Sequence, residues 1–400
     1  MNLYKYYPVA SDRMGIIWTL CTIKDVCIIE FGPAGTTHYA IEGIGTLNAD
    51  DLCTLYSTHM DQSDITFGSY KRIENCIREV DINIKPKYIF IMASSVSSII
   101  GADIESVCME LANEVNAKLI PITTGGLKDD YNAGVEEALG LIAKNMIKAP
   151  SEKKDTYNII GSTADCYNFM QDSVEVKRMM KEVFNKDLNT IFTAYTSVDE
   201  IEKASEASLN IVLRKEGLKV AKFMEKKYNI PYVYKKPIGL TQTLAWINEI
   251  SELMKYEINK QRVEEEEKLI KKYLFRLRFK IRGLENKDVA IFGDRDTVIS
   301  MKDFISELGL NVSRAEVLHG VKEKLDDIIV NSSEMEREQF LSENKLFMLL
   351  ADGVSIDMEH ESSMELQVSN PNINKVNIYP YTPFVGFRGC LYLLEKILSA

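Results

Sequence analysis

Strand-like and helix-like segments alternate along the whole of this 400-residue chain, and this alternation limits its fold more than any other feature. Short runs rich in apolar and β-branched residues, such as 88–93 (YIFIMA) and 118–123 (KLIPIT), are separated by stretches with apolar residues at helical spacing, such as 102–115. Repeated strand–helix–strand units form parallel sheets with right-handed helical crossovers. The sequence therefore predicts an α/β protein made of doubly wound parallel sheets.

The alternation falls into three blocks. An Ala-Pro-Ser segment ends the first block near residue 150, and the third begins at Asp288 with DVAIFGD, a strand that runs into a Gly-Asp turn. Four hundred residues are ordinary for two or three domains. We expect three Rossmann-like domains, at residues 1–150, 151–284 and 285–400. The other expected elements are strands at 25–30, 157–161, 190–195, 208–214, 346–350 and 376–379, a capping box at Ser197 and Glu200, and helices at 139–147, 173–184, 217–228, 241–282, 302–308 and 389–398.

Charge and composition exclude several classes of partner. The net charge of −11 argues against nucleic-acid binding, which needs a concentrated patch of cations. The basic run 276–282 spreads its charges around a helix, which is typical of a solvated surface. No apolar stretch is long enough to span a bilayer, and the N-terminal residues lack the apolar core of a secretory signal. We therefore expect a cytoplasmic protein that contacts neither membrane nor nucleic acid.

The seven cysteines predict neither a disulfide framework nor a zinc site. Their number is odd and none forms a CxxC pair, while the four histidines show no HExxH spacing. Most of the cysteines lie in apolar runs, as buried free thiols do. Cys21, Cys27 and Cys108 are the alternative source of a metal cluster, but their predicted positions face the domain core. We therefore expect no metal site built from this chain's own cysteines.

Loops at the carboxyl ends of the predicted strands are the expected place for a ligand, because parallel α/β sheets bind ligands there. The turn FGPAG at residues 31–35 matches neither the GxGxxG nor the GxxxxGK[ST] nucleotide motif. The loop at residues 94–98 (SSVSS) carries four serines. Their hydroxyls suit an anion at a helix N-terminus, or they simply cap the helix that follows. The residues alone leave both interpretations open.

Several segments taken together resemble the nitrogenase component 1 family. FGPAGTTHYA is similar to the family segment HGPxGC, IMASSVSSIIGADIESV to TC-x4-IGDDI, and SDITFGSYKRI to D-I-x-F-G-G. SLNIVLRKEGLKVAKFMEKKYNIPYV resembles the segment after the second-domain crossover, and YPYTPFVGFRGCLYLLEKIL resembles the C-terminal glycine-bearing loop and helix. The matches occur in order over nearly the whole chain. The family comprises the nitrogenase α and β chains, their cofactor-assembly scaffolds and the light-independent protochlorophyllide reductase subunits.

The resemblance implies three Rossmann-like domains, paired homologous subunits, and electrons delivered by a separate ATP-dependent iron protein. It also implies an iron–sulfur cluster at the subunit interface, held by cysteines from three loops of the first domain. These three cysteine positions are Ser11, Thr36 and Ser95 here. Neutral hydroxyls are poor substitutes for thiolates on iron. We therefore expect that this chain holds no cluster with its own cysteines, and that an iron–sulfur cluster, where one exists, is on a partner chain.

Two further family positions concern the cofactor of the nitrogenase α chain. The position of its cysteine ligand is Arg214 here, and that of its histidine ligand is Val385. An arginine suits an anion such as a carboxylate or phosphate rather than a metal. The resemblance therefore places a set of five residues around a substrate or cofactor cavity. They are Thr36, Ser95, Arg214, Gly386 and Arg388.

Two functions are consistent with these features. The first is a subunit of a nitrogenase-like oxidoreductase that shapes a cavity with a homologous partner chain, or with a second copy of itself, without ligating a cluster. The second is a non-redox binding, carrier or assembly protein for an anionic cofactor or tetrapyrrole. No catalytic residue is identified, although Asp103 is expected to cap a helix and Asp294 to hold its loop. The acid–base candidates in the predicted loops are Asp12, His38, Asp103, Asp294 and Asp296.

Overall fold

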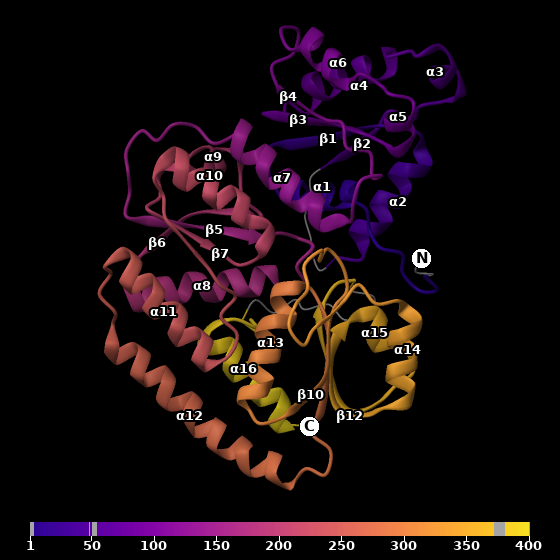
Figure 1. The fold of residues 1–400 in the computed structure, drawn as a ribbon. Coiled ribbons are helices and arrows are strands. Elements are labelled where there is room, and N and C mark those ends of the chain that lie inside the picture. The colour runs from indigo at the N-terminus through magenta and orange to yellow at the C-terminus, as the bar shows by residue number, and fades with distance from the viewer. Residues whose placement is uncertain (1–3, 48, 50–53, 372–380, 400) are drawn as a thin grey trace.

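The computed structural model describes residues 4–47, 49, 54–371 and 381–399. Its named strands form three sheets in which every neighbouring pair is parallel. The sheets follow one another along the chain, and helices lie around each of them (Figure 1). The predicted α/β fold with parallel sheets is confirmed. The domain boundaries near residues 150 and 284 stay predictions.

The first sheet has the strand order β2-β1-β3-β4. Its central strands β1 (Val26–Phe31) and β3 (Tyr88–Ala93) are buried on both faces, which explains their nearly continuous apolar sequences. The edge strands are β2 (Leu55–Ser57) and β4 (Lys118–Ile122). The helices are α1 (Asp12–Leu20), α2 (Ala34–Gly45), α3 (Gln62–Phe67), α4 (Lys71–Asn83), α5 (Ser95–Ile99), α6 (Ile104–Leu111) and α7 (Tyr131–Asn145).

The second sheet has the order β6-β5-β7-β8. Its strands are β5 (Thr156–Ser162), β6 (Asp187–Thr193), β7 (Leu209–Val212) and β8 (Tyr232–Tyr234). The predicted capping box is confirmed, because Ser197 and Glu200 bond reciprocally at the start of α9. The helices are α8 (Phe169–Phe184), α9 (Val198–Glu202), α10 (Leu218–Tyr228), α11 (Leu240–Met254) and α12 (Lys260–Gly283), with 3-10 turns η1 (Ala204–Glu206) and η2 (Lys215–Gly217).

The third sheet has the order β11-β10-β9-β12-β13. The C-terminal helix α16 (Gly386–Ser399) packs against α8, α11 and α12, so the end of the chain returns to helices that follow the second sheet. The strands are β9 (Asp288–Gly293), β10 (Asn311–Val317), β11 (Ile329–Val330), β12 (Lys345–Asp352) and β13 (Glu361–Ser369). The other helices are α13 (Arg295–Glu307), α14 (Glu334–Glu343) and α15 (Gly353–Asp357).

The sheets share hydrophobic cores rather than each having its own. One core joins Ile16 and Val135 of the first region to Ile160 and Val212 of the second sheet. Another joins the second sheet to strands β9 and β12 of the third. Among the described residues, no helix combines the length and the apolarity needed to cross a bilayer.

The structure contains strands that were not predicted, and it divides one predicted helix in two. Strands β10 and β13 were not expected, because polar side chains interrupt both; in β10, Arg314 and Glu316 form an ion pair of 3.0 Å. The single helix expected over 241–282 is two helices, since Lys255 takes the left-handed conformation (φ 57°) that ends α11. The strand expected at 376–379 lies outside the described residues.

Candidate functional site

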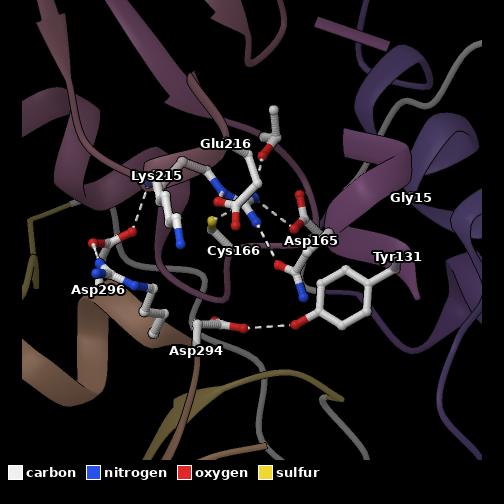
Figure 2. A network of polar contacts seen from close by, with 12 residues as sticks. Gly15, Tyr131, Asp165, Cys166, Lys215, Glu216, Asp294 and Asp296 are labelled. Atoms are coloured by element: carbon white, nitrogen blue, oxygen red, sulfur yellow. Dashed lines mark hydrogen bonds and ion pairs between the residues drawn. The ribbon is translucent and has the colours of Figure 1, made fainter. Parts of the chain in front are cut away.

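Segments from all three sheets meet at one polar junction (Figure 2). Asp165 follows β5, Arg214 follows β7, and Asp294 follows β9, so each lies beyond the carboxyl end of its strand. The first region contributes Tyr131, the first residue of α7. Because α/β proteins bind ligands beyond the carboxyl ends of their strands, this junction is a candidate ligand site.

Arg214 is buried at the centre of the junction, with 5% of its surface exposed. Its Nη1 donates to Asp165 Oδ2 (2.6 Å) and to Thr163 Oγ1 (2.9 Å), and its Nε donates to Glu216 Oε2 (2.7 Å). Gly161 of the neighbouring strand β5 leaves space for this side chain, because a Cβ on Gly161, whose φ is 89°, would lie 2.5 Å from Arg214 Cγ.

Asp165 and Glu216 both form ion pairs with the buried Arg214. Burial alone would lower the pKa of Arg214, but Asp165 beside it holds that pKa well above its usual value. Burial raises the pKa values of Asp294 and Glu216, and Arg214 offsets this only in part. Sequence analysis expected Arg214 to suit an anion, but its charge is already neutralised within the chain. The junction therefore disfavours an anionic group beside Arg214.

Asp294 and Asp296 hold the loop that begins α13. Asp294 accepts hydrogen bonds from Tyr131 Oη (2.8 Å) and Ser369 Oγ (2.9 Å), and so joins the first region to the third sheet. Asp296 accepts the backbone N–H of Lys215 (2.8 Å), which ties the third sheet to the second. Figure 2 shows Asp294 directed at Tyr131 and Asp296 directed at Lys215. These bonds link the three regions, whereas Asp294 was expected to hold its own loop.

A small cavity of about 30 Å³ lies beside the junction. Trp18 Nε1, Asp165 Oδ1 and Asn370 Oδ1 are buried without a hydrogen-bond partner among the described residues, and all three side chains line this cavity. His319 also lines it, and burial lowers the His319 pKa to about 4, so the ring is neutral at pH 7. The full lining is Tyr7, Ala10, Trp18, Thr46, Leu47, Tyr131, Asp165, His319, Asn370 and Pro371.

The hydroxyls at the expected cluster positions lie elsewhere, at the carboxyl edge of the first sheet. Thr36 Oγ1 donates to the carbonyl of Pro33 (2.8 Å) within its own turn. Ser94 caps α5 by accepting the N–H of Ser97 (3.1 Å), and Ser95 is the first residue of that helix. The capping interpretation of the serine loop is therefore confirmed.

Three loops converge at this edge. A Cβ on Gly32 would lie 2.4 Å from Ser94 Cβ, and one on Gly126 would lie 3.0 Å from Ser11 Oγ. Glycine at position 32 lets the turn at 32–36 approach the serine loop closely, and glycine at position 126 lets the loop after β4 approach the start of α1. The turn that carries Thr36 is thus in contact with the loop that precedes Ser95, while Ser11 neighbours Gly126.

A buried ion pair supports these loops from beneath. Arg13 Nη1 donates to Glu30 Oε1 (2.7 Å), and Arg13 Nη2 donates to the carbonyl of Thr36 (3.2 Å). Thr37 Oγ1 donates to the other Glu30 oxygen (3.0 Å). Both charged side chains are almost fully buried. The pair fixes the turn that carries Thr36, and sequence analysis did not identify it.

The family described as nitrogenase component 1 type oxidoreductase matches residues 11–400. The chain belongs to this family. A nitrogenase iron-molybdenum cofactor biosynthesis protein NifE from Clostridium pasteurianum is 28% identical over 315 residues, covering 76% of this chain and 67% of the relative. A light-independent protochlorophyllide reductase subunit from Pyropia yezoensis is 21% identical over 429 residues, covering 100% of this chain and 84% of the relative.

A solved structure of nitrogenase Cp1 at pH 6.5 has the same fold. It superposes with a TM-score of 0.80 at 16% sequence identity, covering 100% of this chain and 94% of that one. At this level of identity the likeness concerns the fold alone. The nitrogenase component 1 fold inferred from the sequence motifs is confirmed.

Four of the cysteines of this family member are buried in its cores, while Cys76 and Cys166 are partly buried. Cys21, Cys27, Cys108 and Cys390 are each at most 5% exposed, as expected of buried free thiols, and Cys53 lies outside the described residues. Burial raises the pKa to about 11 for Cys27 and to about 12 for Cys108 and Cys390, so these thiols are neutral at pH 7. Within the part of the chain that the structure describes, no three His, Cys, Asp or Glu side chains could together hold a metal ion.

The C-terminal family positions are separate from Arg214. Gly386 has a φ of 73°, and its N–H donates to the carbonyl of Pro237 (2.8 Å). Arg388 is exposed, and its backbone N–H donates to Glu175 (3.1 Å). These positions brace the start of α16 against α8 and the segment after β8. The bonds of the five residues fall into three groups, Thr36 with Ser95, Arg214, and Gly386 with Arg388, and their place around one cavity stays a prediction.

The remaining acid–base candidates have structural partners. Asp103 caps α6 by accepting the N–H of Ser106 (3.0 Å), as expected. Asp12 is buried and accepts the N–H groups of Arg13 (2.8 Å) and Lys128 (3.2 Å). His38 is exposed and lies 3.1 Å from Glu42.

Proposed function

We propose that this chain is a subunit of a nitrogenase-like oxidoreductase that pairs with a homologous chain and contributes shape rather than cluster ligands. One observation carries the proposal: the family fold is kept, while Ser11, Thr36 and Ser95 stand where the resemblance assigns thiolates. Hydroxyls with ordinary acidity do not hold iron–sulfur clusters as thiolates do. In this proposal the partner chain holds the cluster and receives the electrons from an ATP-dependent iron protein.

The surroundings of these hydroxyls support this view. The Thr36 hydroxyl donates to its own turn, and Ser94 caps α5 directly before Ser95. The buried Arg13–Glu30 pair fixes the turn from beneath. These contacts fix the shape of the loops with groups of the chain itself. A relative named as a reductase subunit supports a role as one chain of a larger enzyme.

Anaerobic purification tests the proposal. We expect the isolated chain to be colourless and to lack iron and acid-labile sulfide, and its complex with a homologous chain to contain both. The matched control is the triple variant Ser11→Cys, Thr36→Cys, Ser95→Cys, which should gain iron on reconstitution relative to its parent. About four iron atoms per protomer in the isolated parent chain would contradict the proposal.

A second candidate is a non-redox carrier or assembly protein for a cofactor or tetrapyrrole. It is favoured by the similarity to a cofactor biosynthesis protein. The carboxylates around Arg214 mean that an anionic ligand would need a different recognition site. Ligand binding by the isolated chain, with no partner and no reductant, would favour this candidate. A strict requirement for the partner chain and the iron protein would favour the role in a reductase.

A further inference from the structure

The N-terminal segment of residues 4–10, here called the arm, is fastened to α14 by one carboxylate. Glu334 Oε2 accepts the backbone N–H groups of Lys5 (2.6 Å) and Tyr6 (2.9 Å), and Oε1 accepts that of Tyr7 (2.9 Å). Glu334 is 2% exposed and is the first residue of α14, where the helix dipole favours negative charge. Three consecutive amides on one buried carboxylate form a specific attachment.

The arm lies against the small cavity described above. Tyr7 and Ala10 both line that cavity. The Tyr7 hydroxyl is 3.2 Å from Thr46 Oγ1 just after α2, while the Tyr7 ring packs against the core of the third sheet. The arm therefore bridges the first and third regions where the cavity lies, and Glu334 fixes its position.

The cavity has unmet hydrogen-bonding capacity. Trp18 Nε1 is a donor, and Asp165 Oδ1 and Asn370 Oδ1 are acceptors, all buried and without a partner among the described residues. Buried polar atoms are normally satisfied by protein, water or a ligand. A volume of about 30 Å³ has room for roughly two water molecules. A guest larger than this needs the arm to move.

We propose that the cavity binds a neutral group with two donor hydrogens and one acceptor, such as a primary carboxamide, and that the arm is its lid with Glu334 as the latch. The carboxamide oxygen matches the Trp18 donor, and its two N–H groups match Asp165 and Asn370. An anionic group meets two acceptors and is rejected. This inference goes beyond the proposed function and does not depend on it.

Fluorescence quenching tests the lid, because the chain has two tryptophans. Trp18 lines the cavity, whereas Trp246 is fully buried in another core and serves as an internal reference. In Glu334→Gln one acceptor oxygen becomes an NH2 group that faces backbone N–H donors, so the latch fails. We expect acrylamide, a neutral amide, to quench this variant about twofold more strongly than the parent. Adding Trp18→Phe to Glu334→Gln should abolish this increase in quenching.

Glu338→Gln is the matched control, since Glu338 bonds only the side chains of Lys5 and Tyr6 from the next turn of α14. It should leave quenching unchanged. Hydrogen exchange of residues 5–7 should accelerate in Glu334→Gln and not in Glu338→Gln. Faster exchange without greater quenching would show that the arm does not cover the cavity, and no change in either would overturn the latch.

Iodide tests the ligand class. If the cavity rejects anions, iodide quenching should stay at the parent level in Glu334→Gln, and an equal gain for iodide and acrylamide would overturn the carboxamide assignment. Should Glu334→Gln fail to fold, Tyr7→Ala shortens the lid without touching the latch and should show the same acrylamide gain. These outcomes do not depend on iron content or on a partner chain, so they are separate from the test of the proposed function.

Discussion

Arg214 forms buried ion pairs with Asp165 and Glu216, and each carboxylate offsets part of the arginine charge. The guanidinium is held by Asp165 and Glu216, whose removal would leave an unpaired buried charge. The same group reaches Asn132 Oδ1 (3.2 Å) in the first turn of α7. The resemblance to the nitrogenase α chain implies a metal ligand at this position. In this chain the position is instead held by Arg214, whose charged side chain connects the second sheet to the first region.

His319 makes the stability of the protein depend on pH. Burial lowers its pKa from 6.5 to about 4 in the folded state, so the unfolded chain binds more protons between these values. The resulting contribution of His319 to the free energy of unfolding is about 3 kcal/mol. It is fully present above pH 6.5 and is lost as the pH falls toward 4. Urea unfolding from pH 7 to pH 4 should show this loss in the parent and a shallower one in His319→Gln. The exposed His38 is the control, and an equal slope in His319→Gln would contradict the assignment.

The loops of the candidate site could be predicted from the sequence, but most of their contacts could not. The predicted strand ends identified the segments that carry Arg214 and Asp294, because α/β proteins bind ligands at the carboxyl edge of a parallel sheet. The sequence did not single out Asp165 and Glu216, because nothing in their spacing indicates that both contact the Arg214 guanidinium. Arg13 and Glu30 are 17 residues apart on a helix and an inner strand, and only the packing of the helix on the sheet brings them together.

At the scale of elements, the close crossing of α1 and α7 positions Tyr131 for its bond to Asp294. A Cβ on Gly15 would lie 1.9 Å from the Tyr131 carbonyl oxygen, and one on Gly134 would lie 1.8 Å from that of Asp12. The two backbones are thus in direct contact. Glycine is required at both positions because no side chain fits between two backbones at this distance.

Alanine at Gly134 should therefore force the two helices apart. We expect Gly134→Ala to lower the free energy of unfolding by about 3 kcal/mol or more, since the clash is with backbone that cannot rotate away. Gly140→Ala in the same helix meets nothing within 4 Å and should raise stability by up to about 1 kcal/mol through helix propensity. Chemical denaturation of the two variants gives the comparison. Equal effects of the two substitutions would show that the crossing is not tight.

Many elements could be predicted from apolar periodicity, and the exceptions have separate physical causes. In β10 the ion-paired Arg314 and Glu316 interrupt the apolar pattern, although Glu316 is fully buried. Strand β13 lies at an edge and buries only its last residues, so its pattern is weak. The break between α11 and α12 depends on one lysine in the left-handed conformation, which side-chain patterning does not reveal.

At the scale of the whole molecule, the second sheet is the centre of the structure. It shares one buried core with the first region and another with the third sheet. The backbone also crosses between regions: Lys24 pairs with Ser197, and Ile238 pairs with Val385 of the C-terminal loop. No region can unfold without exposing apolar surface of its neighbour, so the three sheets are energetically coupled.

We therefore expect one cooperative unfolding transition, although the sequence indicates three domains. Trp246→Phe leaves Trp18 to report on the first region, and Trp18→Phe leaves Trp246 to report on the core between the second and third sheets. The two variants should show the same urea midpoint, and hydrogen exchange in β12 should report the same free energy. Calorimetric and van't Hoff enthalpies should agree. Separate midpoints for the two tryptophans would mean that the shared cores do not couple the regions.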